Sequence, residues 1–496
     1  MASHFEARRV VVIGGGISGL AAAYELAQAR RSGVPVEEFL IEAGRRLGGV
    51  IRTERRDGFI IEEGPDSFLT EKPHAAQLAR EVGLGDALVG SNDGERRTYI
   101  VHHGRLVPLP DGMMLMAPTR LWPTVISPLI PFGSKLAMAR DWFRSPSAAP
   151  DKVEDESVAT FVRRHFGRGI LENIADPLLA GVYGGDSEQL SIRATLPRFW
   201  EMEQKHGSLI KAAMEARSRH LGSGAKKGAV AGARPLFTTL RSGLEQLVEG
   251  VAAKLETSRT LLGQKVAGIE ALDRVQPRFR VHAESGESHE GDAVILALPA
   301  GEVARLLGRM EPEAEWLGKL PCSSVATVSL AYDDQVRRRL PPGFGFLVPR
   351  KEKRRLLACT FVHTKFPGRV PDGKALLRCF LGGTRDSEVA RLSEPDLRAI
   401  VRSELKGILD LDAEPLFLRA FCSANAMPQY GIGHGERVRR IEDRLCPERR
   451  IFLAGNAYAG IGISDCIRSG REAARRALQA MGPSCGVVSM SQNPAC

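Results

Sequence analysis

Three glycines near the start of the chain have the spacing that binds the phosphates of a dinucleotide. Gly14, Gly16 and Gly19 form a G-x-G-x-x-G pattern directly after the β-branched run at 10–13. The first glycine of such a pattern permits a tight turn, the second lets a pyrophosphate approach the backbone, and the third lets a helix pack closely on a strand. The free N–H groups and the positive end of that helix then favour the phosphates.

Glu42 supplies the second part of this pattern. It ends another apolar run, 36–41, and follows the last glycine by roughly 20 residues. A carboxylate at this position can accept both hydroxyls of an adenosine ribose, and it would repel a 2′-phosphate. Because a strand, the glycines and the acid coincide, an ordinary strand–turn–helix without a ligand is the less favoured interpretation.

The elements that must position these residues form a βαβ unit at 10–41, with a helix expected at 20–30. Apolar residues recur at helical spacing over 155–179, which predicts an amphipathic helical segment. Later strands are expected at 293–298, 325–332, 344–348 and 451–454, and a last helix at 465–481.

The segment 113–144 is strongly apolar and is flanked by Arg and Lys residues. Its longest uncharged stretch, 121–134, contains three prolines. A membrane span needs about 20 continuous apolar residues in a helix, so we predict no crossing here. A segment lying on a membrane surface remains open, as do a buried helical lid and a dimer contact.

The composition indicates a folded chain of several domains. With 496 residues, 43% of them hydrophobic, the chain is too long for one ordinary core, so we expect two or three domains. The formal charge of +10 would suit nucleic acid, an anionic membrane or an acidic substrate, or could reflect only an Arg-rich solvated surface. No RNA-binding or helix-turn-helix pattern supports nucleic acid, so we expect none as a partner.

Other kinds of chemistry lack their motifs. None of the eight cysteines forms a C-x-x-C pair, so we expect no metal site and reduced thiols in a cytoplasmic compartment. Nucleophile-elbow, zinc-protease and P-loop patterns are absent from the sequence, which argues against hydrolase and NTPase functions.

Two segments outside the first glycines resemble the flavoproteins of the amine oxidase and phytoene desaturase superfamily. One continues from Glu42 as RRLGG at 45–49 and GPDS at 64–67, and the other runs from LAGN at 453–456 to GIGI at 460–463. In those proteins the first lies along the pyrophosphate and ribityl chain. A helix beginning near Ser464 would aim its positive end at the flavin N1–C2=O region, where the charge of the reduced flavin develops.

This resemblance implies non-covalent FAD binding by both segments. The residues that it assigns to FAD are Gly14, Gly15, Gly16, Ile17, Ser18, Gly19, Glu42, Ala43, Arg46, Gly49, Val50, Gly64, Pro65, Asp66, Ser67, Val266, Gly455, Asn456, Ile461, Gly462 and Ile463.

Within that superfamily the chain is most similar to the protoporphyrinogen oxidase family, from about residue 8 to residue 480. The stretches that carry this resemblance include GVYGGD at 181–186, GFGFLVP at 343–349 and MPQY at 427–430 with Gly433-His434. The family oxidises protoporphyrinogen IX to protoporphyrin IX by removing six electrons through FAD, and oxygen accepts them to give hydrogen peroxide. Such a member would serve haem biosynthesis.

The resemblance also implies the fold class, α/β: a discontinuous Rossmann-like FAD-binding domain, an α+β substrate domain and a helical membrane-associating domain. The expected boundaries are 1–92, 225–300 and 415–481 for the FAD domain, 93–110 and 301–414 for the substrate domain, 111–215 for the helical domain and 482–496 for a tail.

A porphyrinogen is a large apolar macrocycle with carboxylates on one edge, so its site should be an apolar slot with a cation at the mouth. The resemblance places Leu347 and Phe380 in the slot walls and Arg97 on a propionate, although Arg96 is adjacent. The planar fork of Arg suits a carboxylate. Thr360 stands where the family has another leucine. We assign no general base, because a pyrrole N–H can lose its proton to water.

Other functions stay open on the sequence alone. Coproporphyrinogen III oxidation by the same flavin chemistry differs mainly in the number of substrate carboxylates. An amine or carotenoid oxidase is a further enzyme alternative, and a non-catalytic flavin-bearing tetrapyrrole carrier is an alternative of another class. The family resemblance further leads us to expect a homodimer, peripheral on the cytoplasmic face of the inner membrane, with a possible ferrochelatase contact.

Overall fold

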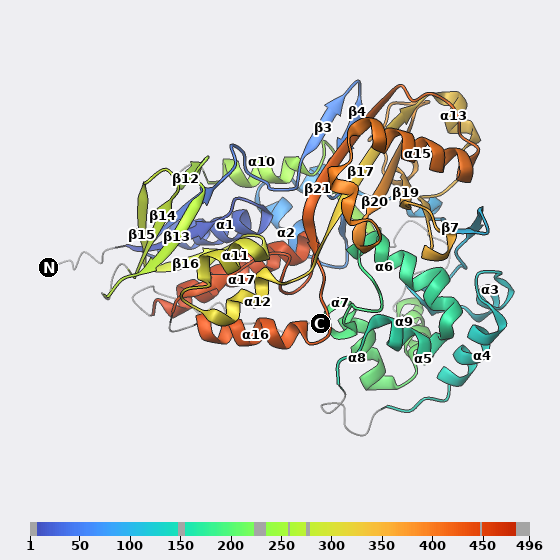
Figure 1. Ribbon diagram of the computed structural model, residues 1–496, viewed down its shortest axis with the longest axis horizontal. Coiled ribbons are helices and arrows are strands. Elements are labelled where there is room, and N and C mark those ends of the chain that lie inside the picture. Colours follow the sequence, from blue (N-terminus) through green and yellow to red (C-terminus); the bar gives the residue numbers. More distant parts are fainter. Residues whose placement is uncertain are drawn as a thin grey trace.

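The computed structural model describes residues 7–146, 154–222, 235–255, 258–273, 278–446 and 449–482. Figure 1 shows three regions: a parallel sheet with its helices at the left, a larger sheet at the upper right, and a group of helices at the lower right. The mixed α/β class expected from the sequence is confirmed. Beyond Gly482, the expected tail lies outside the described residues.

The first region is built on a five-stranded parallel sheet in the order β12-β2-β1-β16-β22. Its strands come from distant parts of the chain: β1 (Arg8–Ile13), β2 (Val36–Glu42), β12 (Arg259–Leu262), β16 (Ala293–Leu296) and β22 (Ile451–Leu453). Val10, Val11 and Val12 are fully buried, as expected for a central parallel strand. Helix α1 (Ile17–Arg31) connects β1 to β2, and helix α17 (Ile463–Ala480) follows β22.

Smaller elements surround this sheet. Two three-stranded antiparallel sheets and a hairpin attach to it, with four helices of eight or more residues. Their bounds are β3 (Thr53–Arg56), β4 (Phe59–Glu62), β5 (Phe68–Leu69), β6 (Leu88–Gly90), β11 (Phe237–Leu240), β13 (Val266–Ala271), β14 (Phe279–Ala283), β15 (Ser288–Gly291), α2 (His74–Glu81), α10 (Glu245–Ala253), α11 (Ala300–Leu307), α12 (Glu315–Gly318) and α16 (His434–Leu445).

The second region is a seven-stranded sheet in the order β21-β17-β20-β19-β18-β7-β8, with α15 (Glu394–Leu409) packed on one face. Its strands are β7 (Thr98–His102), β8 (Arg105–Pro108), β17 (Cys322–Tyr332), β18 (Gly345–Leu347), β19 (Leu356–Phe361), β20 (Ala375–Gly382) and β21 (Phe417–Pro428). Short helices α13 (Asp334–Arg339) and α14 (Val362–Lys365) lie at its ends.

Strand β21 corrects one expected boundary. We assigned 415–481 to the first region, but residues 417–428 pair antiparallel with β17 along almost its whole length. The backbone hydrogen bonds of this strand are therefore made in the seven-stranded sheet, and the chain returns to the first region only after Pro428.

The third region is helical and contains α3 (Leu121–Ile126), α4 (Phe132–Asp141), α5 (Val158–Ile170), α6 (Asp176–Tyr183), α7 (Ile192–Thr195), α8 (Pro197–His206) and α9 (Leu209–Gly222), with the small hairpin β9 (Met113–Met114) and β10 (Ala117–Pro118). The amphipathic segment expected over 155–179 is helical but interrupted at Gly167, whose φ of 78° is one that glycine adopts readily. None of the helices in the described part of the chain has the length and apolarity to span a membrane.

Candidate functional site

The glycine loop after β1 has the geometry that a phosphate site needs. A methyl group on Gly14 would collide with the carbonyl oxygen of Ala297, and one on Gly19 would collide with that of Gly14. These two positions therefore require glycine for the turn and for helix packing. Gly16, in contrast, has nothing within 4 Å of the place where a side chain would begin, so its face is open to a ligand.

Glu42 is fixed beside this loop. Its carboxylate accepts hydrogen bonds from the backbone N–H groups of Gly15 and Gly44, each at 2.6 Å. The carboxylate thus stands at the carboxyl end of β2, next to the loop, where an adenosine ribose would be expected. Val266 begins β13 nearby, two residues after Gln264, whose N–H bonds the Glu42 carbonyl oxygen at 3.0 Å.

The segment after Glu42 folds back onto the glycine loop. The N–H of Gly48 donates to the Gly15 carbonyl at 2.8 Å. Arg46 holds the segment in place, because its guanidinium donates to the carbonyl oxygens of Gly49 at 2.6 Å and Ile51 at 3.1 Å. The exposed Ala43 and Val50 lie on this same segment.

The second glycine segment, 455–463, leads into α17. None of the side chains that the structure describes caps the amino end of α17 or of α1, so the first N–H groups of both helices are left without a side-chain cap. A methyl group on Gly470 of α17 would collide with the Ser18 carbonyl in α1, so the two helices are in direct contact. The structure therefore packs the helix that follows the second glycine segment directly on the helix that follows the first.

Two motif residues without an assigned role hold the second segment. Tyr430 donates its hydroxyl hydrogen to the Asn456 carbonyl and accepts the N–H of Gly460 at 3.1 Å. His434 stacks on Tyr430 with ring centroids 4.2 Å apart, and its Nε2 donates to the Tyr458 carbonyl at 3.2 Å. Burial lowers the pKa of His434 to about 4. The MPQY…GH stretch, which carried only a family resemblance, thus closes the loop at 456–460.

The stretch 64–67 contacts both sheets. A methyl group on Gly64 would collide with the Val50 carbonyl oxygen, so Gly64 and Pro65 begin this stretch against the first glycine segment. Asp66 points instead to the seven-stranded sheet, where Lys365 donates to it at 3.0 Å and Arg378 lies 3.6 Å away. Burial alone would raise the pKa of Asp66, but these two cations hold it well below its usual range.

The predicted slot walls lie in one row across the seven-stranded sheet. Thr327, Phe380, Ala358 and Leu347 are direct cross-strand neighbours on β17, β20, β19 and β18, so their side chains share one face. Two strand spacings, about 10 Å, separate Phe380 from Leu347.

The contacts of the two end residues of this row show which parts of the molecule lie against this face of the sheet. At one end, Thr327 donates to the Glu63 carbonyl at 3.0 Å, next to Gly64. At the other end, Leu347 packs against the helical region and contacts Gly181 of α6. Phe380 and Ala358 therefore lie between the glycine segments and the helices. The sequence did not identify Thr327 or Ala358, because small residues in a strand carry no signal without the register.

Thr360, where the family has a leucine, lies on the same face of β19 as Ala358, two residues further along the strand. It is opposite Arg378 rather than Phe380. The small side chain that directly separates Phe380 from Leu347 is that of Ala358.

The structure does not bring Arg97 to this face. Arg97 is exposed just before β7, and its side chain lies beside Tyr99, whose hydrogen bond raises the pKa of Arg97. Tyr99 packs in the core on the opposite face of the sheet, whereas Ile100 faces the helical region. The propionate role of Arg97 stays a prediction, and Arg96 pairs with Asp93 at 3.8 Å.

The chain is similar to one family of flavoproteins and to porphyrinogen oxidases within it. The sequence matches the flavin containing amine oxidoreductase family over residues 17–478. It is 34% identical to a coproporphyrinogen III oxidase of Bacillus subtilis (strain 168), over 95% of this chain and 98% of that protein. It is 33% identical to a protoporphyrinogen oxidase of Bos taurus, over 95% and 98% of the two chains.

Solved structures agree in fold. A crystal structure from Exiguobacterium sp. 255-15, provisionally named a protoporphyrinogen oxidase, superposes with a TM-score of 0.82 at 31% identity and covers 97% of this chain and 99% of that one. A putrescine oxidase shares the fold alone, with a TM-score of 0.67 at 17% identity, over 95% and 99% of the two chains.

Proposed function

Because this chain belongs to the flavin containing amine oxidoreductase family, and its cofactor is FAD, we propose that it oxidises a porphyrinogen to the corresponding porphyrin. Protoporphyrinogen IX is the first candidate substrate, with oxygen as the electron acceptor. Coproporphyrinogen III is the second, since the Bacillus subtilis relative carries that name.

The residues present fit FAD. The open face of Gly16 and two uncapped helix starts can receive the pyrophosphate and the flavin, and Glu42 can receive the ribose. FAD supplies a two-electron acceptor when bound. The chain's own task is then to hold the macrocycle against it and to exclude water.

One observation carries the substrate proposal: Phe380, Ala358 and Leu347 form one row on the sheet face that lies between the glycine segments and the helical region. A flat, apolar guest would find an aromatic wall at one end, an aliphatic wall at the other and a small residue between them. Aromatic stacking on Phe380 would add about 0.5–1.5 kcal/mol beyond the area that it buries.

The deciding experiment is turnover by the purified flavoprotein. Each porphyrinogen is added in air, and porphyrin fluorescence and hydrogen peroxide are followed. Porphyrin formation from either substrate at a rate well above autoxidation supports the proposal, and the ratio of kcat/KM values chooses between them. A flavin-loaded protein that oxidises neither would instead support a carrier.

We also propose that the helical region rests on a membrane surface. The exposed apolar side chains within its residues 115–143 form what we call the apolar surface: Leu115, Leu121, Trp122, Val125, Ile126, Phe132, Leu136, Trp142 and Phe143. Phe132, at the start of α4, and Phe143, just after its end, are each more than 80% exposed, which is unusual for aromatic side chains. The cations Arg120 and Arg140 are exposed beside them and could meet anionic lipid headgroups.

A membrane surface suits an apolar substrate and product, because the substrate would enter the site and the product would leave it without crossing water. Location on the cytoplasmic face of the inner membrane belongs to the same proposal. Flotation of the protein with vesicles of 30% anionic lipid tests it, since a lid or a dimer contact would leave the protein unbound.

A further inference from the structure

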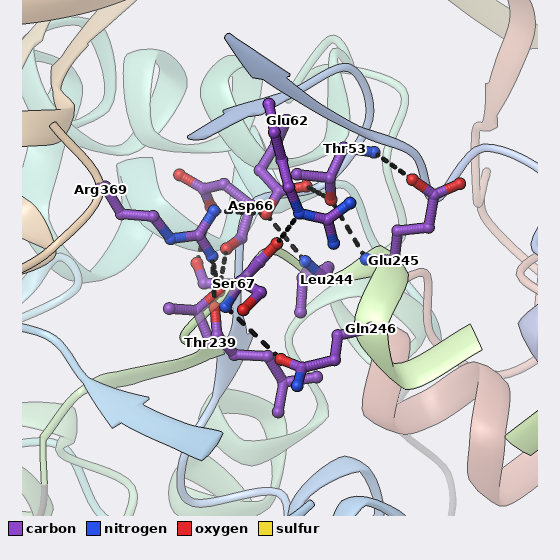
Figure 2. Close-up of polar contacts among 12 residues, drawn as sticks. Thr53, Glu62, Asp66, Ser67, Thr239, Leu244, Glu245, Gln246 and Arg369 are labelled. Carbon is purple, nitrogen blue, oxygen red and sulfur yellow. Dashed lines mark hydrogen bonds and ion pairs between the residues drawn. The ribbon is translucent and has the colours of Figure 1, made fainter. Parts of the chain in front are cut away.

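A buried group of charges joins the first region to the seven-stranded sheet. We call it the junction cluster, and it consists of Glu62, Asp66, Lys365, Arg369 and Arg378. Glu62 and Arg369 pair at 2.5 Å and are each 3% exposed, while the side chain of Arg378 is 5% exposed. Figure 2 shows Asp66, Glu62 and Arg369 converging near Thr239, with Thr53 beside Glu62.

The junction cluster holds more positive than negative charge. Among the described residues, Lys365, Arg369 and Arg378 form ion pairs with two carboxylates, those of Glu62 and Asp66. The nearest other carboxylates have their own cations, since Glu63 pairs with Arg52 and Glu245 lies near Arg46. Charges buried in this way are screened less by salt and water than charges on the surface.

Arg378 is the member with the least complete set of partners. Its Nε is buried and has no hydrogen-bond partner among the described residues. Its contact with Asp66, at 3.6 Å, is looser than the 3.0 Å contact of Lys365. The same guanidinium lies over the ring of Phe380, 4.9 Å from the centroid.

Only backbone separates Arg378 from the segment that binds FAD. Its Nη2 donates to the Gly64 carbonyl, and Gly64 packs directly on the Val50 carbonyl. The Gly48–Val50 stretch in turn lies on Gly15 and Gly16. Arg378 therefore stands where the flavin segments and the slot wall meet.

We propose that Arg378 is an electrostatic positioning residue, whose uncompensated buried charge favours the reduced form of FAD while its guanidinium orients Phe380. Reduced flavin carries additional negative charge, so a fixed cation nearby stabilises it relative to the oxidised form. This inference needs bound FAD but not a particular porphyrinogen, and it goes beyond the proposed reaction.

The test measures the midpoint potential of the bound FAD without any tetrapyrrole. The holoprotein is reduced slowly with dithionite beside a reference dye. Arg378→Met, which removes the charge but keeps the length, should lower the equilibrium constant for two-electron reduction about tenfold, which is about 30 mV. Arg378→Lys keeps the charge and should retain most of the potential.

A second variant of the junction cluster should shift the midpoint potential in the opposite direction. Asp66→Asn removes a negative charge, so the potential should rise. Arg385→Met is the matched control, because Arg385 is similarly buried at 13% exposure and pairs with Asp176 in α6, away from Gly64.

FAD content and circular dichroism establish that each variant is folded and loaded. If Arg378→Met does not fold, a raised potential in Asp66→Asn beside an unchanged potential in Arg385→Met still decides. Equal potentials in all the loaded proteins would overturn the inference. Because no substrate is present, that outcome differs from a failure to oxidise porphyrinogens.

Discussion

Gly470 of α17 lies directly against the Ser18 carbonyl of α1, with no room between them for a methyl group. Further along, Arg475 of α17 bonds Glu25 of α1 at 2.6 Å, so the two helices run parallel. Parallel helices present their amino ends on the same side. The positive ends that follow the two glycine segments therefore lie on the same side, as the proposed FAD site requires.

Gly470→Ala should loosen this contact and release FAD. Overpacking of a tight interface costs about 1–3 kcal/mol, and here backbone must move. We expect a lower melting temperature and a lower FAD content, measured by intrinsic flavin fluorescence during heating. Gly435→Ala in α16 is the control, because an added methyl group there would meet no described residue outside its own helix within 4 Å. Equal melting of Gly470→Ala and the parent protein would contradict the close packing.

Glu42→Ala should weaken FAD binding at the ribose without unfolding the first region. The lost charge-assisted hydrogen bonds are worth about 1.5–3 kcal/mol, which corresponds to roughly 10- to 100-fold in Kd. Equilibrium dialysis of the deflavinated protein against FAD measures the change. Glu37→Ala on the same strand is the control, since Glu37 is exposed and pairs with Arg9 at 3.5 Å. An unchanged Kd for Glu42→Ala would remove Glu42 from the site.

The sequence predicted what depends on local pattern. The β1–α1–β2 unit, the uninterrupted strand β17 and the last helix were expected within a few residues of their observed bounds. Gly14, Gly16 and Glu42 were identifiable because their spacing alone defines a turn, an open face and a strand end.

What the sequence could not predict depends on pairing between distant segments. Strand β21 was placed in the wrong region, because an alternating pattern does not reveal its partner strand. The junction of Asp66 with Lys365 and Arg378 spans about 300 residues of chain, so no spacing rule could indicate it. Arg97 was selected by motif, whereas its side chain follows the face of Tyr99.

Phe380→Ala should weaken substrate binding more than turnover. Loss of a stacked aromatic wall costs about 1.5–3 kcal/mol, so KM should rise roughly 10- to 100-fold while kcat changes less. Steady-state rates with each porphyrinogen, followed by porphyrin fluorescence, measure both constants. Phe380→Leu keeps an apolar wall and should recover part of the loss. A KM that stays at the parent value would place the substrate elsewhere.

Acidification should release FAD through His434. Its pKa in the folded protein, about 4, lies below the usual 6.5 because the ring is buried. When the 456–460 loop is open, His434 has its usual pKa and binds a proton first as the pH falls. The stabilisation of the closed loop is therefore complete above pH 6.5 and is lost toward pH 4. The full effect on closure of the 456–460 loop is about 3 kcal/mol.

FAD retention between pH 7 and pH 4, measured by gel filtration and absorbance, checks this expectation. His434→Gln can still donate to the Tyr458 carbonyl but does not titrate, so its retention should depend less on pH. The same steep loss in both proteins would assign the acid sensitivity to another group.

The apolar surface should carry membrane binding through its most exposed aromatic side chains. Replacing Phe132 and Phe143 together by Ser removes two rings that would enter the lipid interface, each worth about 1–2 kcal/mol, so the vesicle partition coefficient should fall more than tenfold. Sedimentation with anionic vesicles measures it, and added salt should weaken the contribution of Arg120 and Arg140. Leu262→Ser with Leu416→Ser is the matched control, because both leucines are about half exposed but lie outside the helical region. Equal partitioning of the two double variants would show that the apolar surface does not meet lipid.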